Sequence, residues 1–373
     1  MPVVIGAIRE RAPNENRVAL VPEVAGKIIA LGAKVAMERG AGARAQFPDA
    51  TYKGVEFADS AQTILGAANV LLKVQGPSVE EIAQLKQGAV VISFMQAHQR
   101  HDEVRALRDR GVTSFAMEFV PRISRAQSMD ALSSQAAVAG YKAVLIAANT
   151  LDKFFPMLTT AAGTIRPAQV LVVGAGVAGL QAIATARRLG AVVEAYDVRS
   201  ATKEQVKSLG AKFIDTGVSA EGTGGYAREL TDEEKRKQQE ILDARIAVAD
   251  VVITTAAVPG RTAPRIVTRA AVERMKAGAV IVDIAAESGG NCELTRAGET
   301  VVHGGVRIVG PLNLPSQLAY HASEMYARNL LNFLKPAIAN GELKIDWNDE
   351  VFAQSCLTHE RAIKHEPTRK LIA

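Results

Sequence analysis

Residues 169–179 have the sequence Gln-Val-Leu-Val-Val-Gly-Ala-Gly-Val-Ala-Gly, an apolar run followed by glycines in the spacing Gly-x-Gly-x-x-Gly. The apolar run predicts a buried strand, and the glycines lead into an amphipathic helix at Gly179–Leu189. Asp197 follows the next predicted strand, 23 residues after Gly174. Strand, glycine turn, helix, strand and acidic residue in this order form the complete fingerprint of a dinucleotide-binding βαβ unit.

Each glycine of this fingerprint has its own physical role. Gly174 makes the tight turn, Gly176 lets the backbone approach a pyrophosphate, and Gly179 lets the helix pack closely on the strand. The helix N-terminus offers N–H donors and a positive dipole to the phosphates. Asp197 can accept hydrogen bonds from the adenosine ribose diol and repels a 2′-phosphate, so we expect NAD(H) in spite of the nearby Arg199. The alternative is an ordinary α/β turn whose glycines serve packing.

Strand and helix patterns alternate on both sides of the fingerprint. Strands are predicted at Val3–Ile8, Lys34–Met37, Val70–Val74, Val90–Phe94, Val170–Val173, Val192–Tyr196, Val251–Thr255, Val280–Ile284 and Val306–Val309. Helices are predicted at Val21–Leu31, Ala61–Leu65, Val79–Lys86, Val104–Arg110, Ser133–Asn149, Gly179–Leu189, Lys203–Leu209, Ala270–Met275 and Ser316–Leu334. This alternation predicts an α/β protein with two Rossmann-like domains, each with a parallel sheet, and a cleft between them.

The 373 residues suffice for two domains with real cores. We expect one domain from residues 1–132 together with 315–373, and a nucleotide-binding domain from residues 133–314. The Ala-rich helix Ser133–Asn149 connects the two, and the helix Ser316–Leu334 returns to the first. Gly222–Lys237 is glycine-rich and then strongly charged, which predicts a long mobile loop.

Composition excludes several classes of protein. There is no run of 18 apolar residues, so no membrane span is expected, and Met1–Gly6 predicts a first strand and not a signal peptide. The net charge of +5 is scattered among 39 acidic residues, which argues against a nucleic-acid partner. Cys292 and Cys356 allow at most one bridge, and a reduced cytoplasmic setting is the better interpretation. No metal-ligand motif such as Cys-x-x-Cys is present.

A second informative segment is residues 122–135, Arg-Ile-Ser-Arg-Ala-Gln-Ser-Met-Asp-Ala-Leu-Ser-Ser-Gln. It places Arg122, Gln127, Asp130 and several serine hydroxyls on a polar loop that ends at a helix start. These donors and acceptors suit a carboxamide and a ribose, but the segment has no His, Cys or Lys for proton transfer. The alternative is a solvated charged loop in which Ser133 is the N-cap of the helix.

Together these motifs resemble the alanine dehydrogenase/PNT superfamily, and within it the NAD(H)-binding component of proton-translocating transhydrogenase. The resemblance extends from Pro2 to about Thr358, nearly the whole chain. The motifs that carry it are Asn16-Arg17-Val18-Ala19, the segment Pro121–Asp130, the glycine fingerprint with Asp197-Val198-Arg199, and Ile284–Cys292.

The two branches of this superfamily differ in their chemistry. Alanine dehydrogenases resemble this chain at Arg17, but they have a lysine where this chain has Gln75, a histidine at Gln96 and an aspartate at Glu287. Oxidation of an amino acid needs a general base and a clamp for the carboxylate. Hydride transfer between two nicotinamide rings moves no proton, so it needs only position, orientation and exclusion of water. His98 would restore a base if the alignment slipped by two residues.

The resemblance also implies roles for individual residues. Arg122, Asp130 and Ser133 resemble contacts to the nicotinamide carboxamide and its ribose, and Gln127 resembles a residue that reaches the ribose of NADP(H) on a partner. Tyr226 resembles a lid residue, although it could be ordinary loop filler. The remaining cofactor-binding residues implied are Ile123, Ser124, Gly174, Gly176, Val177, Gly179, Asp197, Val198, Arg199, Gly225, Gln238 and Ala257.

The function implied is direct hydride transfer between NADH and NADP⁺, coupled to proton translocation by membrane partner subunits. This chain would bind NAD(H), and NADP(H) would be bound by a partner subunit. We further expect a homodimer, peripheral on the inner face of the cytoplasmic membrane. The alternatives are an amino-acid dehydrogenase and a NAD-binding regulatory or scaffold protein without turnover.

Overall fold

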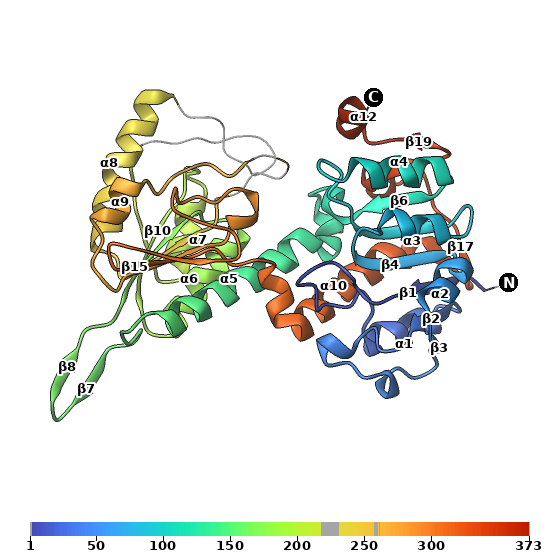
Figure 1. Ribbon diagram of the computed structural model, residues 1–373, viewed down its shortest axis with the longest axis horizontal. Helices are drawn as coiled ribbons and strands as arrows, with labels where there is room; N and C mark the ends of the chain where they lie inside the picture. Colours follow the sequence, from blue (N-terminus) through green and yellow to red (C-terminus); the bar gives the residue numbers. More distant parts are fainter. Residues whose placement is uncertain (1, 218–230, 257–259, 261, 373) are drawn as a thin grey trace. The chain divides into compact units, whose positions relative to one another are not determined.

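The computed structural model describes residues 2–217, 231–256, 260 and 262–372 (Figure 1). The chain divides into two compact units, Met1–Gln135 with Ser316–Ala373, and Ala136–Pro315. Both ends of the chain therefore build the first unit, and the second unit is one continuous segment.

The first unit is built on an eight-stranded sheet in the order β19-β18-β6-β5-β4-β1-β2-β3. Its strands are β1 Val4–Ala7, β2 Lys34–Glu38, β3 Glu56–Ala58, β4 Val70–Gln75, β5 Val90–Phe94, β6 Thr113–Ala116, β18 Cys356–His359 and β19 Ala362–Ile363. Its helices are α1 Pro22–Ala30, α2 Ala61–Ala67, α3 Val79–Gln84, α4 His101–Arg110, α10 Ala319–Leu334, α11 Glu350–Ser355 and α12 Glu366–Ile372. Strands β1 to β6 pair in parallel, whereas β18 and β19 join antiparallel.

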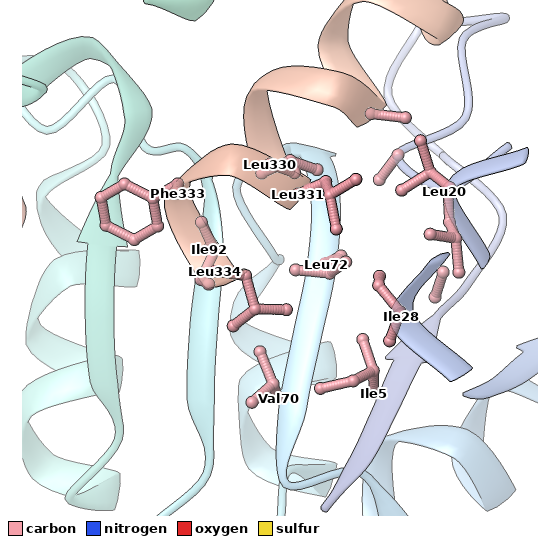
Figure 2. Packing of buried hydrophobic residues seen from close by; sticks show 14 of the residues in the cluster. Ile5, Leu20, Ile28, Val70, Leu72, Ile92, Leu330, Leu331, Phe333 and Leu334 are labelled. Atoms are coloured by element: carbon pink, nitrogen blue, oxygen red, sulfur yellow. The ribbon is translucent and has the colours of Figure 1, made fainter. Parts of the chain in front are cut away.

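Alternating side chains of this sheet enter two separate hydrophobic clusters, because successive residues of a strand point to opposite faces. Leu72 of β4 lies in one cluster and its neighbour Leu71 in the other. Figure 2 shows the first cluster, in which α10 packs Leu330 and Leu334 close to Val70 and Leu72. The C-terminal part of the chain is thus needed to cover one face of the N-terminal sheet.

The second unit has a seven-stranded sheet in the order β11-β10-β9-β12-β13-β15-β14. Its strands are β9 Gln169–Val173, β10 Val192–Tyr196, β11 Lys212–Phe213, β12 Val251–Thr254, β13 Val280–Asp283, β14 Thr300–His303 and β15 Val306–Val309. Its helices are α6 Val177–Arg188, α7 Thr202–Ser208, α8 Asp232–Val248 and α9 Arg269–Glu273. All neighbours pair in parallel except β14 with β15. Because strand order reverses at β9, a ligand crevice is expected at the carboxyl ends of β9 and β12.

The α/β class and the mainly parallel sheets confirm the sequence prediction, and β5 has the predicted bounds. The prediction of wholly parallel sheets was wrong for β14, β18 and β19. A hairpin of β7 Leu158–Thr160 and β8 Gly163–Ile165, which was not predicted, stands clear of the second sheet in Figure 1. Its residues are exposed, so no burial pattern marked it as two strands.

Residues 222–230 of the predicted loop Gly222–Lys237 lie outside the described residues, and the prediction is wrong in its last part, because helix α8 begins at Asp232. Thr231 and Glu234 form a capping box, and three acidic residues fill the first turn of α8. The capping box and the acidic residues stabilise the start of a helix. From the sequence alone, the charge of this segment instead favours a loop. In Figure 1, α8 lies beside α9, and the two helices are in contact.

The long helix α5, Ala131–Thr150, runs from the first unit into the second. By length and composition, it is the one helix in the described ranges that could cross a membrane. A buried helix of a globular core passes the same test, and 44% of its most apolar window is buried inside the protein. Its sequence includes Lys142 and several polar residues, so it is weak evidence for a span.

Candidate functional site

The glycine turn lies between β9 and α6, at the carboxyl end of β9, an interior strand of the second sheet. Gly174 has φ +101°, a left-handed conformation, and its carbonyl accepts a hydrogen bond from Thr255 Oγ1 at 3.0 Å. A Cβ atom on Gly179 would lie 1.8 Å from the carbonyl oxygen of Gly174. Both positions therefore require glycine, as the sequence predicted, because helix and turn touch directly through their backbones.

Gly176 serves a different purpose, since space is open above it. A Cβ atom there would meet nothing closer than the Arg199 Nη2 atom at 3.9 Å. Gly176 is the N-cap of α6 and has no side chain that could accept from the first N–H groups. Val177, the first helical residue, is 42% exposed. The helix start thus presents free backbone donors and room for an anion.

Asp197 directly follows β10 and is only 7% exposed. Its Oδ2 atom accepts from the backbone N–H of Ala175 at 2.7 Å, so the carboxylate is joined to the glycine turn. Arg199 clamps the same carboxylate, with Nε 2.8 Å from Oδ1 and Nη2 2.8 Å from Oδ2. Arg199 is therefore committed to Asp197 and is not an independent site for a 2′-phosphate. Val198 is partly buried and packs against a hydrophobic cluster of the second unit.

Two buried polar residues, which the sequence argument did not select, hold the neighbouring loops. Asp283 at the end of β13 is fully buried and accepts from the backbone N–H groups of Asn291 and Cys292 at 2.7 and 3.0 Å. Asn291 in turn accepts from Ala256 N at 3.0 Å and donates to Ala256 O at 2.7 Å. The motif Ile284–Cys292 thus fixes the loop that follows β12. An acidic residue near the end of an apolar strand was the signal available in the sequence.

Segment 122–133 belongs to the first unit, which extends as far as Gln135, and it forms a short 3-10 helix, Ser124–Met129, followed by α5. The structure corrects the predicted N-cap. Asp130, not Ser133, caps α5, since its Oδ1 atom accepts from Ser133 N at 2.8 Å and its Oδ2 from Ser133 Oγ at 2.6 Å. These hydrogen bonds bring together Asp130 and Ser133, two residues that the sequence analysis expected at the nicotinamide carboxamide and its ribose.

The rest of this segment is held by the core of the first unit and by helix α10. Ala126 and Met129 are buried in the core of the first unit, and the carbonyl of Ser128 accepts from Asn329 and Asn332 of α10 at 2.9 and 3.1 Å. By contrast, Arg122, Ser124 and Gln127 are exposed, and Ile123 is half-buried. A fixed backbone therefore presents the exposed polar side chains that a ligand could contact.

Two of the positions that separate the two branches of the superfamily, Gln75 and Gln96, lie in the first unit near Arg17, which the branches share. Arg17 is 4% exposed and donates to Glu15, with Nη2 2.6 Å from Oε2. Gln75 Nε2 donates to the same Oε2 at 2.8 Å, and Gln96 Nε2 donates to Gln75 Oε1 at 3.3 Å. Gln96, and not His98, therefore continues this polar chain. Glu287, the third position that separates the branches, lies in the second unit and accepts from Asn313 N at 3.1 Å.

A cavity of about 660 Å³ opens in the first unit beside these amides. Its lining includes Gln75, Gln96 and the buried Lys73, whose Nζ lies 3.5 Å from Glu10 and 3.1 Å from Glu81. Burial raises the pKa of Glu10, although the charge of Lys73 and the N–H of Val74 oppose that rise. Every one of these ionisable groups is already engaged by a partner.

Three predicted site residues, Gly225, Tyr226 and Ala257, lie outside the described residues, and their roles stay predictions. Gln238 lies on α8 and is buried, 9% exposed. Within the described ranges, no set of three His, Cys, Asp or Glu residues could hold a metal ion. Both cysteines are free and buried in separate clusters.

The doubly wound second unit, the glycine turn and the acidic residue after β10 define a two-unit α/β nucleotide-binding protein of the dehydrogenase type. Models of the alanine dehydrogenase/PNT N-terminal and C-terminal domains match residues 6–139 and 143–366. The chain is 48% identical over 370 residues to a protein of Rhodospirillum rubrum that is named as one portion of NAD(P) transhydrogenase subunit alpha, with 96% of each chain covered.

Comparison with solved structures supports the same family. A transhydrogenase structure from Sinorhizobium meliloti is 47% identical with a TM-score of 0.88, covering 96% of this chain and 99% of that chain. An L-alanine dehydrogenase structure, 22% identical with a TM-score of 0.82 and 99% coverage of both chains, shares the fold. The chain belongs to the alanine dehydrogenase/PNT family, and within it to the alpha subunits of NAD(P) transhydrogenase. Its C-terminal domain is a nucleotide-binding domain.

Proposed function

We propose that this chain binds NAD(H) and holds its nicotinamide ring for direct hydride exchange with NADP(H) on a partner subunit. The observation that carries the proposal is the polar chain Gln96–Gln75–Glu15–Arg17. At the two positions where an amino-acid dehydrogenase needs a lysine and a histidine, it has neutral amides hydrogen-bonded to the protein itself.

The second unit fits a dinucleotide. The open space at Gly176 and the uncapped start of α6 suit a pyrophosphate, because backbone N–H groups and the helix dipole favour an anion there. Asp197 would accept from the hydroxyls of the adenosine ribose, either beside or in place of Arg199. Val177 and Val198 would flank the nucleotide, and Gly179 keeps helix and turn in register.

The first unit supplies the groups for the nicotinamide end. Arg122 would contact the carboxamide, and Asp130 with Ser133 would contact the ribose, while Ile123 and Ser124 would line that end. Bound NADH supplies the hydride, which leaves with both electrons of its C–H bond, so no proton has to be moved by this chain. The residues therefore act by orienting the ring and excluding water, which can contribute several orders of magnitude in rate.

Further aspects of the proposal concern the assembly. The relative from Rhodospirillum rubrum is by its name only a portion of an alpha subunit, which supports the existence of further transhydrogenase subunits. We propose that among them are partners that bind NADP(H) and span the membrane. We propose that these partners couple hydride transfer to proton translocation. We also propose that the chain forms a homodimer and lies on the cytoplasmic face of the membrane.

Two assays test the proposal. Equilibrium titration should give tighter binding of NADH than of NADPH. Mixing the chain with NADH, an NADP⁺ analogue and a transhydrogenase NADP(H)-binding domain should give hydride transfer that depends on both proteins. Reduction of NAD⁺ by alanine in the absence of any partner would contradict the proposal and favour an amino-acid dehydrogenase. Binding of NADH without transfer would favour a regulatory NAD-binding protein.

A further inference from the structure

The buried face of helix α10 carries an amide side chain, Asn329. It is 7% exposed and lies along the helix between Tyr326 and Leu330, which are both fully buried in the core of the first unit. A buried amide costs free energy unless its donor and its acceptor both have partners. Both groups of Asn329 are engaged, since Nδ2 donates to the carbonyl of Ser128 at 2.9 Å and Oδ1 accepts from Ser134 Oγ at 2.7 Å.

These two partners lie on either side of the turn that contains Asp130. Ser128 is in the last turn of the 3-10 helix Ser124–Met129, where backbone carbonyls lack a partner within their own helix. Ser134 is in the first turn of α5. Asn329 therefore joins the end of one helix to the start of the next, across the turn at Asp130.

The turn that Asn329 holds is the one from which the proposed ligand contacts project. Asp130 accepts from the backbone N–H and the hydroxyl of Ser133 within this turn, and Gln127 is exposed just before it. The spacing of these three side chains is thus set by the path of the backbone between Ser128 and Ser134.

Loss of the Asn329 amide would release one side of this turn. Ser134 Oγ has a second acceptor within its own helix, the carbonyl of Ala131 at 3.1 Å, so it would not need the core for a hydrogen bond. Ser128 would keep its bond from Asn332 Nδ2 at 3.1 Å. The start of α5 could then shift relative to Ser128, because the direct link between them would be lost.

We propose that Asn329 is a positioning residue for hydride transfer, which acts through this turn and not by contact with a nucleotide. It fixes Asp130 and Ser133, which would hold the nicotinamide ribose, relative to Gln127, which would reach the second nucleotide. A misplacement of reacting groups near 1 Å can cost on the order of 100-fold in rate. The inference rests on the proposed function and adds to it a residue 201 positions after Ser128 in the chain.

The test compares the binding of NADH with that of ADP in the parent and in Asn329→Ala. ADP has the adenosine and pyrophosphate that the second unit would bind, but it lacks the nicotinamide and its ribose. The variant should bind NADH roughly 3- to 10-fold more weakly, because hydrogen bonds to the ribose are misplaced, and ADP as the parent does. Transfer to an NADP⁺ analogue with the partner domain, at saturating NADH, should slow on the order of 10- to 100-fold.

Thr358→Val is the matched control for a general loss of stability. Thr358 is fully buried in the same unit and donates to the carbonyl of Val112 at 2.8 Å. Its removal should lower the Tm, as Asn329→Ala does, while the transfer rate and the ratio of NADH to ADP affinity stay those of the parent. Equal losses of transfer in the two variants would reduce Asn329 to a structural residue and overturn the proposal.

A double-mutant cycle with Ser134→Ala tests the link itself. Ser134 is only partly buried, so this variant should fold even where Asn329→Ala does not, and it should lower the affinity ratio in the same direction. The rate losses of the two single variants should not add, because both break one contact. Additive losses, or an unchanged affinity ratio in the single variants, would overturn the proposal. If the parent transfers no hydride, the proposed function fails, and the affinity ratio still decides the role of Asn329.

Discussion

At the scale of single residues, Asp197 has two tasks, of which the sequence indicated one. Its carboxylate is a candidate partner for the ribose, and it also fastens the glycine turn through Ala175 N and holds Arg199. Its two oxygens already accept hydrogen bonds from Ala175 N and from the backbone and guanidinium of Arg199, so the ribose has to share or replace the guanidinium. In the proposed complex with NAD(H), competition between Arg199 and the ribose for Asp197 would set the preference between NADH and NADPH.

We expect Asp197→Ala to weaken NADH binding roughly 10- to 100-fold, since bonds to a charged acceptor are lost. NADPH binding should weaken less, because Arg199 becomes free to contact a 2′-phosphate. Titration of both cofactors into variant and parent measures the change in preference. Equal affinity of the unmutated chain for the two cofactors would remove Asp197 from the proposed role.

Gln127 is exposed on a segment whose backbone is anchored by Ala126, Met129 and the asparagines of α10. An amide carries both donors and an acceptor, so it can bridge two riboses without adding charge. We expect Gln127→Asn, which shortens the reach, to slow hydride transfer on the order of 100-fold, because a misplacement near 1 Å suffices.

The binding of NADH should change little in Gln127→Asn, whereas Arg122→Ala should weaken it. Fluorescence titration gives the affinities, and transfer to an NADP⁺ analogue with the partner domain gives the rates. Normal transfer by Gln127→Asn would show that this residue does not bridge the two nucleotides.

At the scale of elements, the contact between α5 and the start of α6 positions the glycine turn. Gly140 lies within the Ala-rich α5, and a Cβ atom there would lie 2.0 Å from the carbonyl oxygen of Ala178. The two helices thus meet backbone to backbone beside the proposed pyrophosphate site. Ala178 lies next to Gly179 in the fingerprint, so a shift of α5 would move the turn as well.

The expected effect of Gly140→Ala on stability follows from this contact. Intrinsic helix propensity favours alanine by about 1 kcal/mol, but displacement of packed backbone costs more, so the variant should be less stable and bind NADH more weakly. Gly66→Ala in α2 is the matched control, because nothing lies within 4 Å of its Cβ position. It should be neutral or stabilising. A Gly140→Ala variant with a higher Tm than the parent would contradict the close packing.

At the scale of the whole molecule, the C-terminal segment Ser316–Ala373 completes the first unit. Strand β18 pairs with β6, and α12 follows His365, whose ring stacks on Phe119 at 3.9 Å between centroids. His365 Nδ1 lies 2.7 Å from Thr368 Oγ1 at the start of α12. Burial lowers the pKa of His365, and burial likewise lowers the pKa of His359 in β18.

The lowered pKa values of His365 and His359 make the stability of the first unit depend on pH. In the unfolded chain a histidine takes up a proton near pH 6.5, but the folded chain does so only at lower pH. The unfolded state therefore binds more protons below about pH 6.5, and the stability of the first unit falls as pH falls. His365→Asn keeps an acceptor for Thr368 without titrating, so its Tm should fall less between about pH 7.5 and 5.5. The exposed His98→Asn is the control, and equal pH dependence of all three proteins would contradict the expectation.

Local patterns in the sequence were sufficient for the α/β class, most strand and helix positions, and the glycine turn with Asp197. Each of these depends on residues close together in the chain, such as the apolar run before Gly174. Short exposed elements such as the hairpin β7–β8 and the charged start of α8 gave no apolar periodicity, and they were missed for that reason. The antiparallel strands were missed for two reasons. Strand β18 pairs with β6, which lies far away in the chain, whereas β14 and β19 are short strands that form local hairpins with β15 and β18.

Tertiary structure alone decided features that depend on what a residue touches across the fold. Nothing near Gly140 distinguishes it from the alanines around it, since its requirement comes from Ala178 in another helix. Asp283 ends an apolar strand and Asn291 lies in the following loop, and only the fold shows that Asp283 holds the backbone of Asn291 and that Asn291 holds Ala256. Glu15 resembles any surface acid in the sequence, and only the fold buries it and surrounds it with donors from Arg17 and Gln75. Periodicity and turn chemistry act along the chain and can be predicted from it, whereas packing, burial and hydrogen bonding between distant residues arise only when the chain has folded.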